Sequence, residues 1–340
     1  MTDVSQSELI YGDTGYICTS FYKLEYQYMA IERKKAYAPA TVSNICVGFD
    51  VLGFAMEAPG DEVIAGYHPT PGVTILSTNH EKIPMDARLN TASVAVQAML
   101  DALGEKTMGI GLDIIKKMPV GTGMGSSAAS AAAALVAANA LLGDPFRKAD
   151  LLEFAVKGEQ AADGAVHADN VAPSLLGGLV LIRSLSPADV IQLPVPADLY
   201  YALLFPHITI LTKEARGILT PEIPMKQFIQ QTANMGALVA GLYRGDWEMM
   251  SRSLVDVVIE PQRARLIPFL SQVKTAAYGA GAITSSISGA GPAIFSLAKG
   301  KETIEKVVLA IKEVMNEIKV PHDIHVGRIN TKGSVLMEGR

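Results

Sequence analysis

A glycine-rich stretch over residues 119–138, PVGTGMGSSAASAAAALVAA, constrains this chain more than any other part of it. Glycine adopts backbone angles barred to other residues, so a loop of this kind can turn its N–H groups inward. The first turn of the alanine-rich helix that follows adds unpaired N–H groups and a partial positive charge. The stretch therefore predicts an anion site, and the usual anion is a nucleotide phosphate. The loop glycines, at alternate positions, are Gly121, Gly123 and Gly125.

Three better-known glycine motifs do not match this stretch. A lysine-bearing P-loop requires Gly-Lys-Ser/Thr, and no lysine follows Gly125; the spacing G-x-G-x-G also differs from the dinucleotide fingerprint G-x-G-x-x-G. The nucleophile elbow G-x-S-x-G is absent. A glycine turn into a close-packed core helix stays open as the plainer alternative. The hydroxyls of Ser126 and Ser127 could add hydrogen bonds to an anion or reach a magnesium ion.

Length, charge and cysteine content exclude several classes of protein. A chain of 340 residues favours two domains, and 49% hydrophobic residues supply ample core. The net charge of −5, without a basic stripe, argues against a nucleic-acid partner. Cys18 and Cys46 have neither metal nor redox spacing, which fits a cytoplasmic protein without disulfides. No apolar run approaches the roughly 18 residues of a membrane span, so no membrane partner is expected.

Hydrophobic periodicity predicts a mixture of helices and strands. A segment with three prolines, residues 184–198, predicts a linker between domains. Thr212 is expected to cap a short helix, and Asn90 is a candidate cap of the helix over residues 90–103. Strands are expected from Lys35 and over residues 61–67, 73–78, 109–117, 199–211 and 322–329. Helices are expected over residues 90–103, 147–162, 227–243, 246–258, 266–279 and 301–318.

With Pro119 before it and paired serines after it, the glycine stretch closely resembles the phosphate loop of the GHMP kinases. Residues 38–55, APATVSNICVGFDVLGFA, resemble the first motif of the homoserine kinases within that family. HADNVAP, residues 167–173, resembles the same group most closely, and residues 283–297, ITSSISGAGPAIFSL, match the third family motif. The resemblance covers residues 34–334, with the family motifs in order.

This resemblance implies a fold, a reaction and a domain division. The implied fold is α+β, with a phosphate-loop domain like ribosomal protein S5 domain 2 and a ferredoxin-like C-terminal domain. The implied reaction transfers the γ-phosphoryl group of ATP, with Mg²⁺, to the side-chain hydroxyl of L-homoserine in threonine biosynthesis. The family also suggests a homodimer. We expect domains over residues 30–190 and 191–340, and we expect residues 1–29 to be a dispensable extension or a mis-assigned start, which deletion of residues 1–28 would test.

The resemblance also implies site roles. Catalysis would involve Asn170, Asp169 and Arg216. Substrate would contact Asn44, Asp50, His167, Thr212 and Arg263, and a carboxylate such as Asp50 suits the ammonium group of an amino acid. ATP would be bound by Pro119, Gly121, Gly123, Gly125, Ser126, Ser127 and Ala128. Magnesium would be held by Ser126 and Glu159.

Several alternatives stay open at this point. Asp169 acts as a base in sister families, whereas homoserine kinases are described as working without one, with Asn170 positioning the hydroxyl. Arg265 lies close enough in sequence to exchange places with Arg263. The substrate could be an isoprenoid precursor, such as mevalonate or phosphomevalonate, and a catalytically silent nucleotide-binding regulator is a further alternative. Because no lysine follows the loop, the positive charge that stabilises phosphoryl transfer has to come from the helix end, from magnesium and from an arginine.

Overall fold

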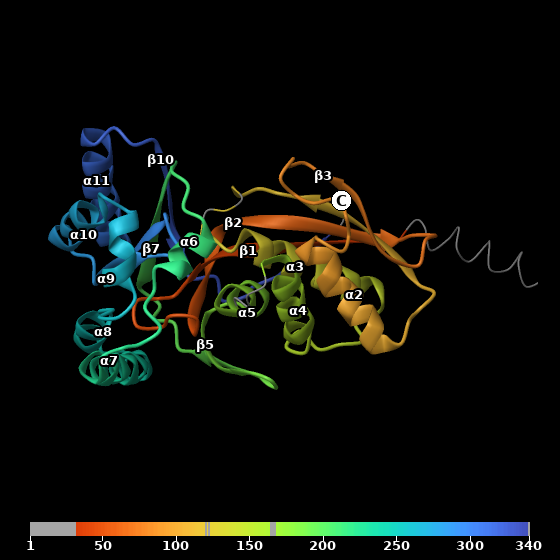
Figure 1. The fold of residues 1–340 in the computed structure, drawn as a ribbon, viewed down its shortest axis with the longest axis horizontal. Helices are drawn as coiled ribbons and strands as arrows, with labels where there is room; N and C mark the ends of the chain where they lie inside the picture. Colours follow the sequence, from red (N-terminus) through yellow and green to blue (C-terminus); the bar gives the residue numbers. More distant parts are fainter. Residues whose placement is uncertain (1–31, 120, 122, 164–167, 339–340) are drawn as a thin grey trace, which may run out of the picture.

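The computed structural model describes residues 32–119, 121, 123–163 and 168–338, and its strands form two sheets with helices packed against each (Figure 1). The N-terminal extension expected from the sequence lies outside the described residues. Within the described part, no helix is long and apolar enough to cross a membrane. The candidate site lies where the two sheets approach each other.

The first sheet is built around one long strand, β2, Leu52–Tyr67. One half of β2 pairs with β4 and the other with β5, while β1 runs antiparallel along nearly its whole length. The strand order is β11–β1–β2–β4–β3, with β5 and then β6 continuing from the far half of β2. The other strands are β1 Arg33–Ser43, β3 Gly72–Thr78, β4 Gly109–Ile115, β5 Leu179–Leu185, β6 Ala188–Leu193 and β11 Val335–Met337.

Four helices cover one face of this sheet (Figure 1). They are α2 Thr91–Leu103, α3 Ser126–Leu141, α4 Leu151–Asp163 and α5 Ala168–Leu176. Asn90 caps α2 by accepting hydrogen bonds from the N–H groups of Ala92 and Ser93, as its position before an apolar period predicts.

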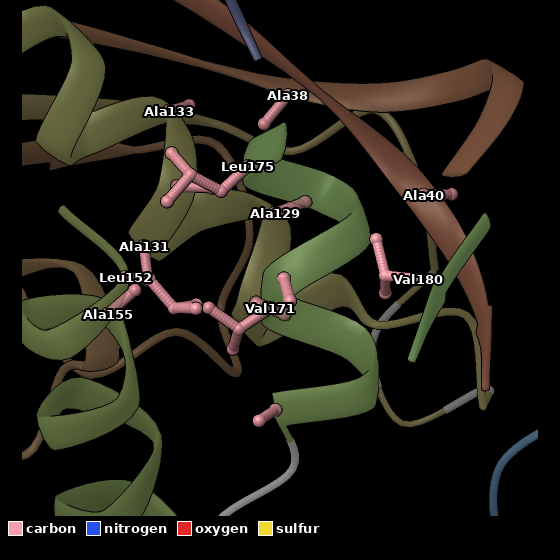
Figure 2. Close-up of a cluster of buried hydrophobic side chains, with 14 of the residues drawn as sticks. Ala38, Ala40, Ala129, Ala131, Ala133, Leu152, Ala155, Val171, Leu175 and Val180 are labelled. Atoms are coloured by element: carbon pink, nitrogen blue, oxygen red, sulfur yellow. The ribbon is translucent and has the colours of Figure 1, made fainter. Parts of the chain in front are cut away.

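The alanine-rich helix α3 lies at the centre of the layer, and 14 of its 16 residues are buried. A helix that is apolar all round must be buried on every side, and alanine lets its neighbours approach closely. Figure 2 shows Ala129 and Ala131 of α3 close to Val171 of α5 and Leu152 of α4. Strand β4 therefore leads directly through the glycine loop into the most enclosed helix of the domain.

The second sheet has four antiparallel strands in the order β10–β7–β9–β8. Two helices, α10 and α11, pack against it, while α7 and α8 form a pair beside it (Figure 1). Along the chain its elements follow a βαββαβ order, which confirms the expected ferredoxin-like arrangement. The elements are β7 Leu199–Pro206, α6 Thr212–Gly217, α7 Met225–Arg244, α8 Trp247–Ser253, α9 Glu260–Arg263, α10 Leu270–Gly279, β8 Thr284–Ile287, β9 Ile294–Lys299, α11 Lys301–Glu317 and β10 His322–Arg328.

A shared apolar core joins the two sheets. Phe54 of β2 contacts Tyr201 of β7 and Phe295 of β9, with ring centroids 5.6 and 6.2 Å apart. The Tyr201 hydroxyl donates to the Ala58 carbonyl oxygen at 3.1 Å and accepts from the Glu57 N–H at 3.2 Å. Burial raises the pKa of Tyr201 above its ordinary value, which fits a hydroxyl enclosed between two domains. The mutual position of the two sheets is thus held by packing as well as by polar contacts.

Strand pairing bears on the expected domain division. The proline-containing segment 184–198 carries β6, which pairs with β5 in a hairpin of the first sheet. After the second sheet the chain returns to the first, where β11 pairs with β1. The first sheet thus includes residues beyond 190, and the boundary between residues 190 and 191 stays a prediction.

Three local expectations are wrong. Thr212, the expected cap, is instead the first residue of α6. Leu211 occupies the N-cap position, and no side chain there forms a capping hydrogen bond. The expected strand 199–211 ends at Pro206. The expected helix 246–258 ends at Ser253, since the Asp256 carboxylate accepts the N–H groups of the next turn and redirects the chain.

Candidate active site

The phosphate loop joins the end of β4 to the first turn of α3. Gly121, Gly123 and Gly125 have φ values of 74°, 74° and 66°, in the left-handed region that glycine tolerates best. Gly125 is the N-cap of α3 and makes no side-chain hydrogen bond to the helix. The N–H groups of the first turn are therefore not capped by that residue, as an anion site requires.

The third family motif packs directly against this loop. The Ser288 hydroxyl donates to the Gly123 carbonyl oxygen at 2.9 Å, and a Cβ on Gly123 would lie 2.9 Å from the Ser288 carbonyl oxygen. On the other side, a Cβ on Gly125 would lie 2.1 Å from Thr41 Oγ1. The loop is thus enclosed by the second sheet on one side and by β1 on the other, and both approaches require glycine.

A cavity of about 280 Å³ brings the loop together with residues from both sheets. A concave site with converging polar groups is the usual form of a small-molecule site. Its lining consists of Ser43, Asn44, Asp50, Gly121, Gly123, Gly125, Ser126, Ser127, Glu159, Asp169, Asn170, Ile210, Thr212, Arg216, Arg263, Gly289, Ala290 and Gly291.

Most of the residues singled out from the sequence are brought together in this lining. Ala128, in the first turn of α3, is fully buried in the core and does not line the cavity, and neither does the exposed Pro119. His167 lies outside the described residues. Arg263 is buried at the cavity, whereas Arg265 is exposed and outside the lining. The roles expected for these residues remain proposals.

Two arginines and one aspartate form the charged end of the cavity. Arg216 holds Asp50 through both Nη atoms, at 3.0 and 2.9 Å, in the bidentate arrangement typical of arginine and carboxylate. Arg263 donates to the carbonyl oxygens of Ala215 and Gly289, at 3.0 and 2.9 Å. Burial, and next the charge of Arg216, lower the pKa of Arg263, although an arginine stays protonated in proteins.

The ring of Phe49 lies against both guanidinium groups. Its centroid is 5.4 Å from Arg216 Cζ and 4.9 Å from Arg263 Cζ, within the range of a cation–π contact. Since like charges repel, a contact shared with one aromatic ring helps to hold the two arginines near each other. Sequence reasoning missed Phe49, because nothing in the chain signals which ring meets an arginine far along the sequence.

Asn44 holds the loop that carries Asp50. Its side-chain oxygen accepts the Asp50 N–H at 2.7 Å, and its side-chain nitrogen donates to the Gly289 carbonyl oxygen at 2.9 Å. Asn44 and Asp50 both have φ of 59°, a left-handed conformation that Asn and Asp tolerate better than most residues. The amide of Asn44 is thus largely engaged with protein, and the substrate contact expected of it stays a prediction.

Asp169 and Asn170 open α5 beside the phosphate loop. Asp169 Oδ2 accepts the backbone N–H of Asn44 at 3.1 Å, and its side chain is buried. Asn170 donates to Ser43 Oγ at 3.0 Å and accepts from Thr41 Oγ1 at 2.9 Å. Ser43 was not singled out from the sequence, although it directly precedes a candidate and its hydroxyl lies in the lining.

Two side chains at the cavity are suited to magnesium. Ser126 Oγ is buried and has no hydrogen-bond partner among the described residues, and Glu159 of α4 is buried in the same lining. The described residues contain no cluster of three or more His, Cys, Asp or Glu side chains that could hold a metal. Magnesium at a nucleotide takes one or two carboxylates and completes its shell with phosphate oxygens and water, so this donor set fits the ion.

Comparison with known proteins places the chain in a family. The model of the GHMP kinases N terminal domain matches residues 90–178, and that of the GHMP kinases C terminal matches residues 238–317. A homoserine kinase of Chlorobium phaeovibrioides is 46% identical over 321 residues, covering 89% of this chain and 99% of its own. A homoserine kinase of Chlorobium phaeobacteroides is 44% identical over 316 residues, with the same coverage.

Solved structures agree with the sequence comparison. The crystal structure of homoserine kinase from Cytophaga hutchinsonii has a TM-score of 0.87 and 45% identity, covering 90% of this chain and 97% of that one. Mevalonate kinase from L. major has a TM-score of 0.67 at 16% identity, covering 89% and 98%, and this likeness shows the fold alone. From its family models, its relatives and its three motifs around one cavity, the chain belongs to the GHMP kinases and, among them, to the homoserine kinase family.

Proposed function

We propose that this chain catalyses transfer of the γ-phosphoryl group of ATP to the side-chain hydroxyl of L-homoserine, which forms O-phospho-L-homoserine for threonine biosynthesis. One observation carries the proposal beyond family membership: a single cavity joins an anion-binding loop to a bidentate Asp50–Arg216 pair. The loop suits a triphosphate, and the pair suits an amino-acid zwitterion. Each half of the reaction thus has its own recognition surface.

The nucleotide phosphates are bound by backbone amides of the loop and of the first turn of α3. Amides held in position need no reorganisation when negative charge develops, and positioning with electrostatic stabilisation supplies most of the catalysis in phosphoryl transfer. Ser126 and Glu159 hold Mg²⁺ against the phosphates in this proposal. The ion, when bound, offsets the charge that accumulates on the phosphate oxygens.

The substrate zwitterion takes over the Asp50–Arg216 pair. Its ammonium group binds Asp50 and its carboxylate binds Arg216 and Arg263, so every charge that loses a partner gains another. Because an unpaired charge in a half-buried site is costly, this exchange favours a ligand that carries both groups. Mevalonate has a carboxylate but no ammonium group and would leave Asp50 without a partner, so the exchange discriminates against it. Thr212 lies in the same lining and contributes a hydroxyl.

Asn170 orients the attacking hydroxyl, and no dedicated base acts in this proposal. In a loose transition state the attacking hydroxyl needs little help in losing its proton. Asp169 then serves to hold the Asn44 loop through its contact with the Asn44 N–H. Arg216 stays close enough to the cavity to stabilise charge on the transferred group.

Release of ADP tests the proposal, measured with L-homoserine, mevalonate and 4-hydroxybutyrate, which is homoserine without its amine. Of these three compounds, we expect only L-homoserine to support turnover at low millimolar concentration. Asp50→Ala should raise the KM for L-homoserine about 100-fold, the size expected for truncating one partner of a charge pair. It should leave the KM for ATP nearly unchanged and bring the specificity for L-homoserine over 4-hydroxybutyrate close to one. Equal effects on both KM values would reject the assignment, and ATP binding without turnover would favour a silent regulator.

Two further features belong to the proposal. The cytoplasm is the proposed location, which suits a chain whose Cys46 is a buried free thiol. A homodimer is proposed on the family resemblance, and light scattering coupled to size-exclusion chromatography tests it by giving the mass in solution.

A further inference from the structure

A lysine lies behind the phosphate loop rather than within it. Lys116 follows β4, and its side chain is 2% exposed. Its Nζ donates to the Ser126 carbonyl oxygen at 2.7 Å and to Ser130 Oγ at 2.9 Å, and it pairs with the Asp61 carboxylate. The three donors of the ammonium group thus have three acceptors, two of which are on the first turns of α3.

The lysine is held firmly in this position. The Asp61 side chain is fully buried, and its second oxygen accepts the Lys117 N–H at 2.9 Å. Asn79 accepts the backbone N–H of Lys116 at 2.7 Å and donates to its carbonyl oxygen at 3.0 Å. Lys116 does not line the cavity, and its direct hydrogen bond to a lining residue is the one to Ser126.

A contribution to stability is by itself a weak explanation for burying the Lys116–Asp61 ion pair. Burial lowers the pKa of Lys116, whereas the charges of Asp61 and Glu159 oppose that shift. A buried ion pair costs desolvation that its attraction barely offsets, and apolar residues of similar size often serve the fold as well or better. The contact with Ser126 points instead to the site, because that residue lines the cavity and its buried Oγ has no hydrogen-bond partner in the part of the chain that the structure describes.

We propose that Lys116 is a positioning residue of the phosphate site, holding the Ser126 carbonyl so that the first turn of α3 and the Ser126 hydroxyl face the bound phosphates. It also places a positive charge behind that turn, where a lysine-bearing P-loop would place one in front. The inference rests on the proposed function, since it concerns the same nucleotide site. It accounts for how the loop works without a lysine after Gly125.

The test is nucleotide binding, measured by calorimetry with ADP in the presence and in the absence of Mg²⁺. Lys116→Met alone leaves the Asp61 charge buried and unpaired, so it threatens folding. The informative variant is therefore Lys116→Met with Asp61→Leu, which removes both charges and keeps the volume. A matched control is Arg33→Met with Asp113→Leu, which removes an ion pair of the same sheet away from the cavity.

We expect the Lys116/Asp61 double variant to melt within a few degrees of the unaltered chain and to bind ADP with Mg²⁺ about 10- to 100-fold more weakly, the loss typical of a charge-assisted hydrogen bond. The KM for ATP should rise with that loss, while the KM for L-homoserine and the affinity of the control variant stay within about twofold. A double variant that binds ADP as tightly as the unaltered chain would show that the pair serves the fold alone. If the unaltered protein bound ADP with Mg²⁺ but did not phosphorylate homoserine, the proposed function would be refuted. The role of Lys116 would then still be decided by the nucleotide-binding data.

Discussion

At the scale of single residues, the charged end of the cavity depends on side chains that come from distant parts of the chain. Asp50 and Arg216 are 166 positions apart and meet through two parallel hydrogen bonds. Phe49, next to Asp50, lies against Arg216 and also against Arg263. The geometry of two guanidinium groups is thus tied to the loop that carries the carboxylate, so the substrate exchange proposed at Asp50 would act on a preassembled group.

Phe49→Leu tests the aromatic contact. Each cation–π contact is worth about 0.5–1 kcal/mol at a partly exposed site, so losing two should raise the KM for L-homoserine by roughly 5- to 30-fold. The KM for ATP should change less than about twofold, because the ring does not line the phosphate loop. Phe228→Leu is the matched control, since Phe228 lines the same apolar groove as Phe49 at an exposed position. Steady-state kinetics with each substrate varied in turn distinguishes the outcomes, and equal effects of both variants would argue against the ring contact.

Asp169→Asn tests whether a base is used. The variant keeps an oxygen that can accept the Asn44 N–H, so the Asn44 loop should stay in place. General base catalysis is worth about 10²–10⁴-fold, so a kcat that falls less than tenfold at saturating substrates would agree with the proposal. A fall of a thousandfold or more would restore Asp169 as the base. Asp169→Ala, which also removes the acceptor, should raise the KM for L-homoserine as the loop loosens.

At the scale of elements, the glycine loop shows two separate reasons for glycine. Gly121 and Gly125 both have positive φ, yet a Cβ on Gly121 would meet no described residue beyond its chain neighbours within 4 Å, whereas one on Gly125 would lie 2.1 Å from Thr41 Oγ1. The first position needs glycine for its backbone angle alone. The second needs it for the angle and for the close approach of α3 to β1.

This difference predicts unequal effects of alanine at the two positions. An alanine in the left-handed conformation costs about 1–2 kcal/mol. Gly121→Ala should therefore strain the loop and raise the Kd for ADP with Mg²⁺ modestly. Gly125→Ala adds a clash with Thr41, so it should weaken nucleotide binding by at least a further tenfold, the factor that corresponds to about 1.4 kcal/mol. Calorimetric titration of both variants, with melting curves to verify folding, makes the comparison. A Gly121 variant as impaired as the Gly125 variant would mean that backbone angle dominates at both positions.

At the scale of the whole molecule, the two sheets share one apolar core. The cluster that surrounds α3 continues through Phe54 to Tyr201, Phe295 and Leu238 of the second domain. The cavity lies at this junction, and its lining includes residues from both sides. Since the shared core also fixes how the two halves of the site face each other, stability and activity should be linked here.

Phe54→Ala tests that linkage. Truncating a fully buried phenylalanine costs about 3–5 kcal/mol, so the melting temperature should fall by several degrees or more. We expect a single unfolding transition in calorimetry before and after the change, because the core crosses the domain boundary. Phe146→Ala, at a half-buried ring that contacts the buried Phe154 away from the junction, should destabilise less. Two separated transitions in the unaltered chain would contradict a shared core.

Much of this protein could be predicted from local chemistry. Gly121, Gly123 and Gly125 adopt the angles that only glycine takes easily, and Asn90 caps the helix that it precedes. Such features depend on neighbours within a few residues, so the sequence displays them directly. Motif resemblance extended this to Asp50, Arg216 and Glu159, which do line one cavity.

What only the tertiary structure decided is how distant residues are paired. The sequence by itself determined a glycine loop before a buried alanine helix, from which a phosphate site is predicted. It did not show that Lys116 hydrogen-bonds to Ser126, that Phe49 contacts two arginines, or that residues 184–198 add a strand to the first sheet. The physical reason is that these contacts depend on strand register and on the packing of two sheets, which a local pattern does not specify.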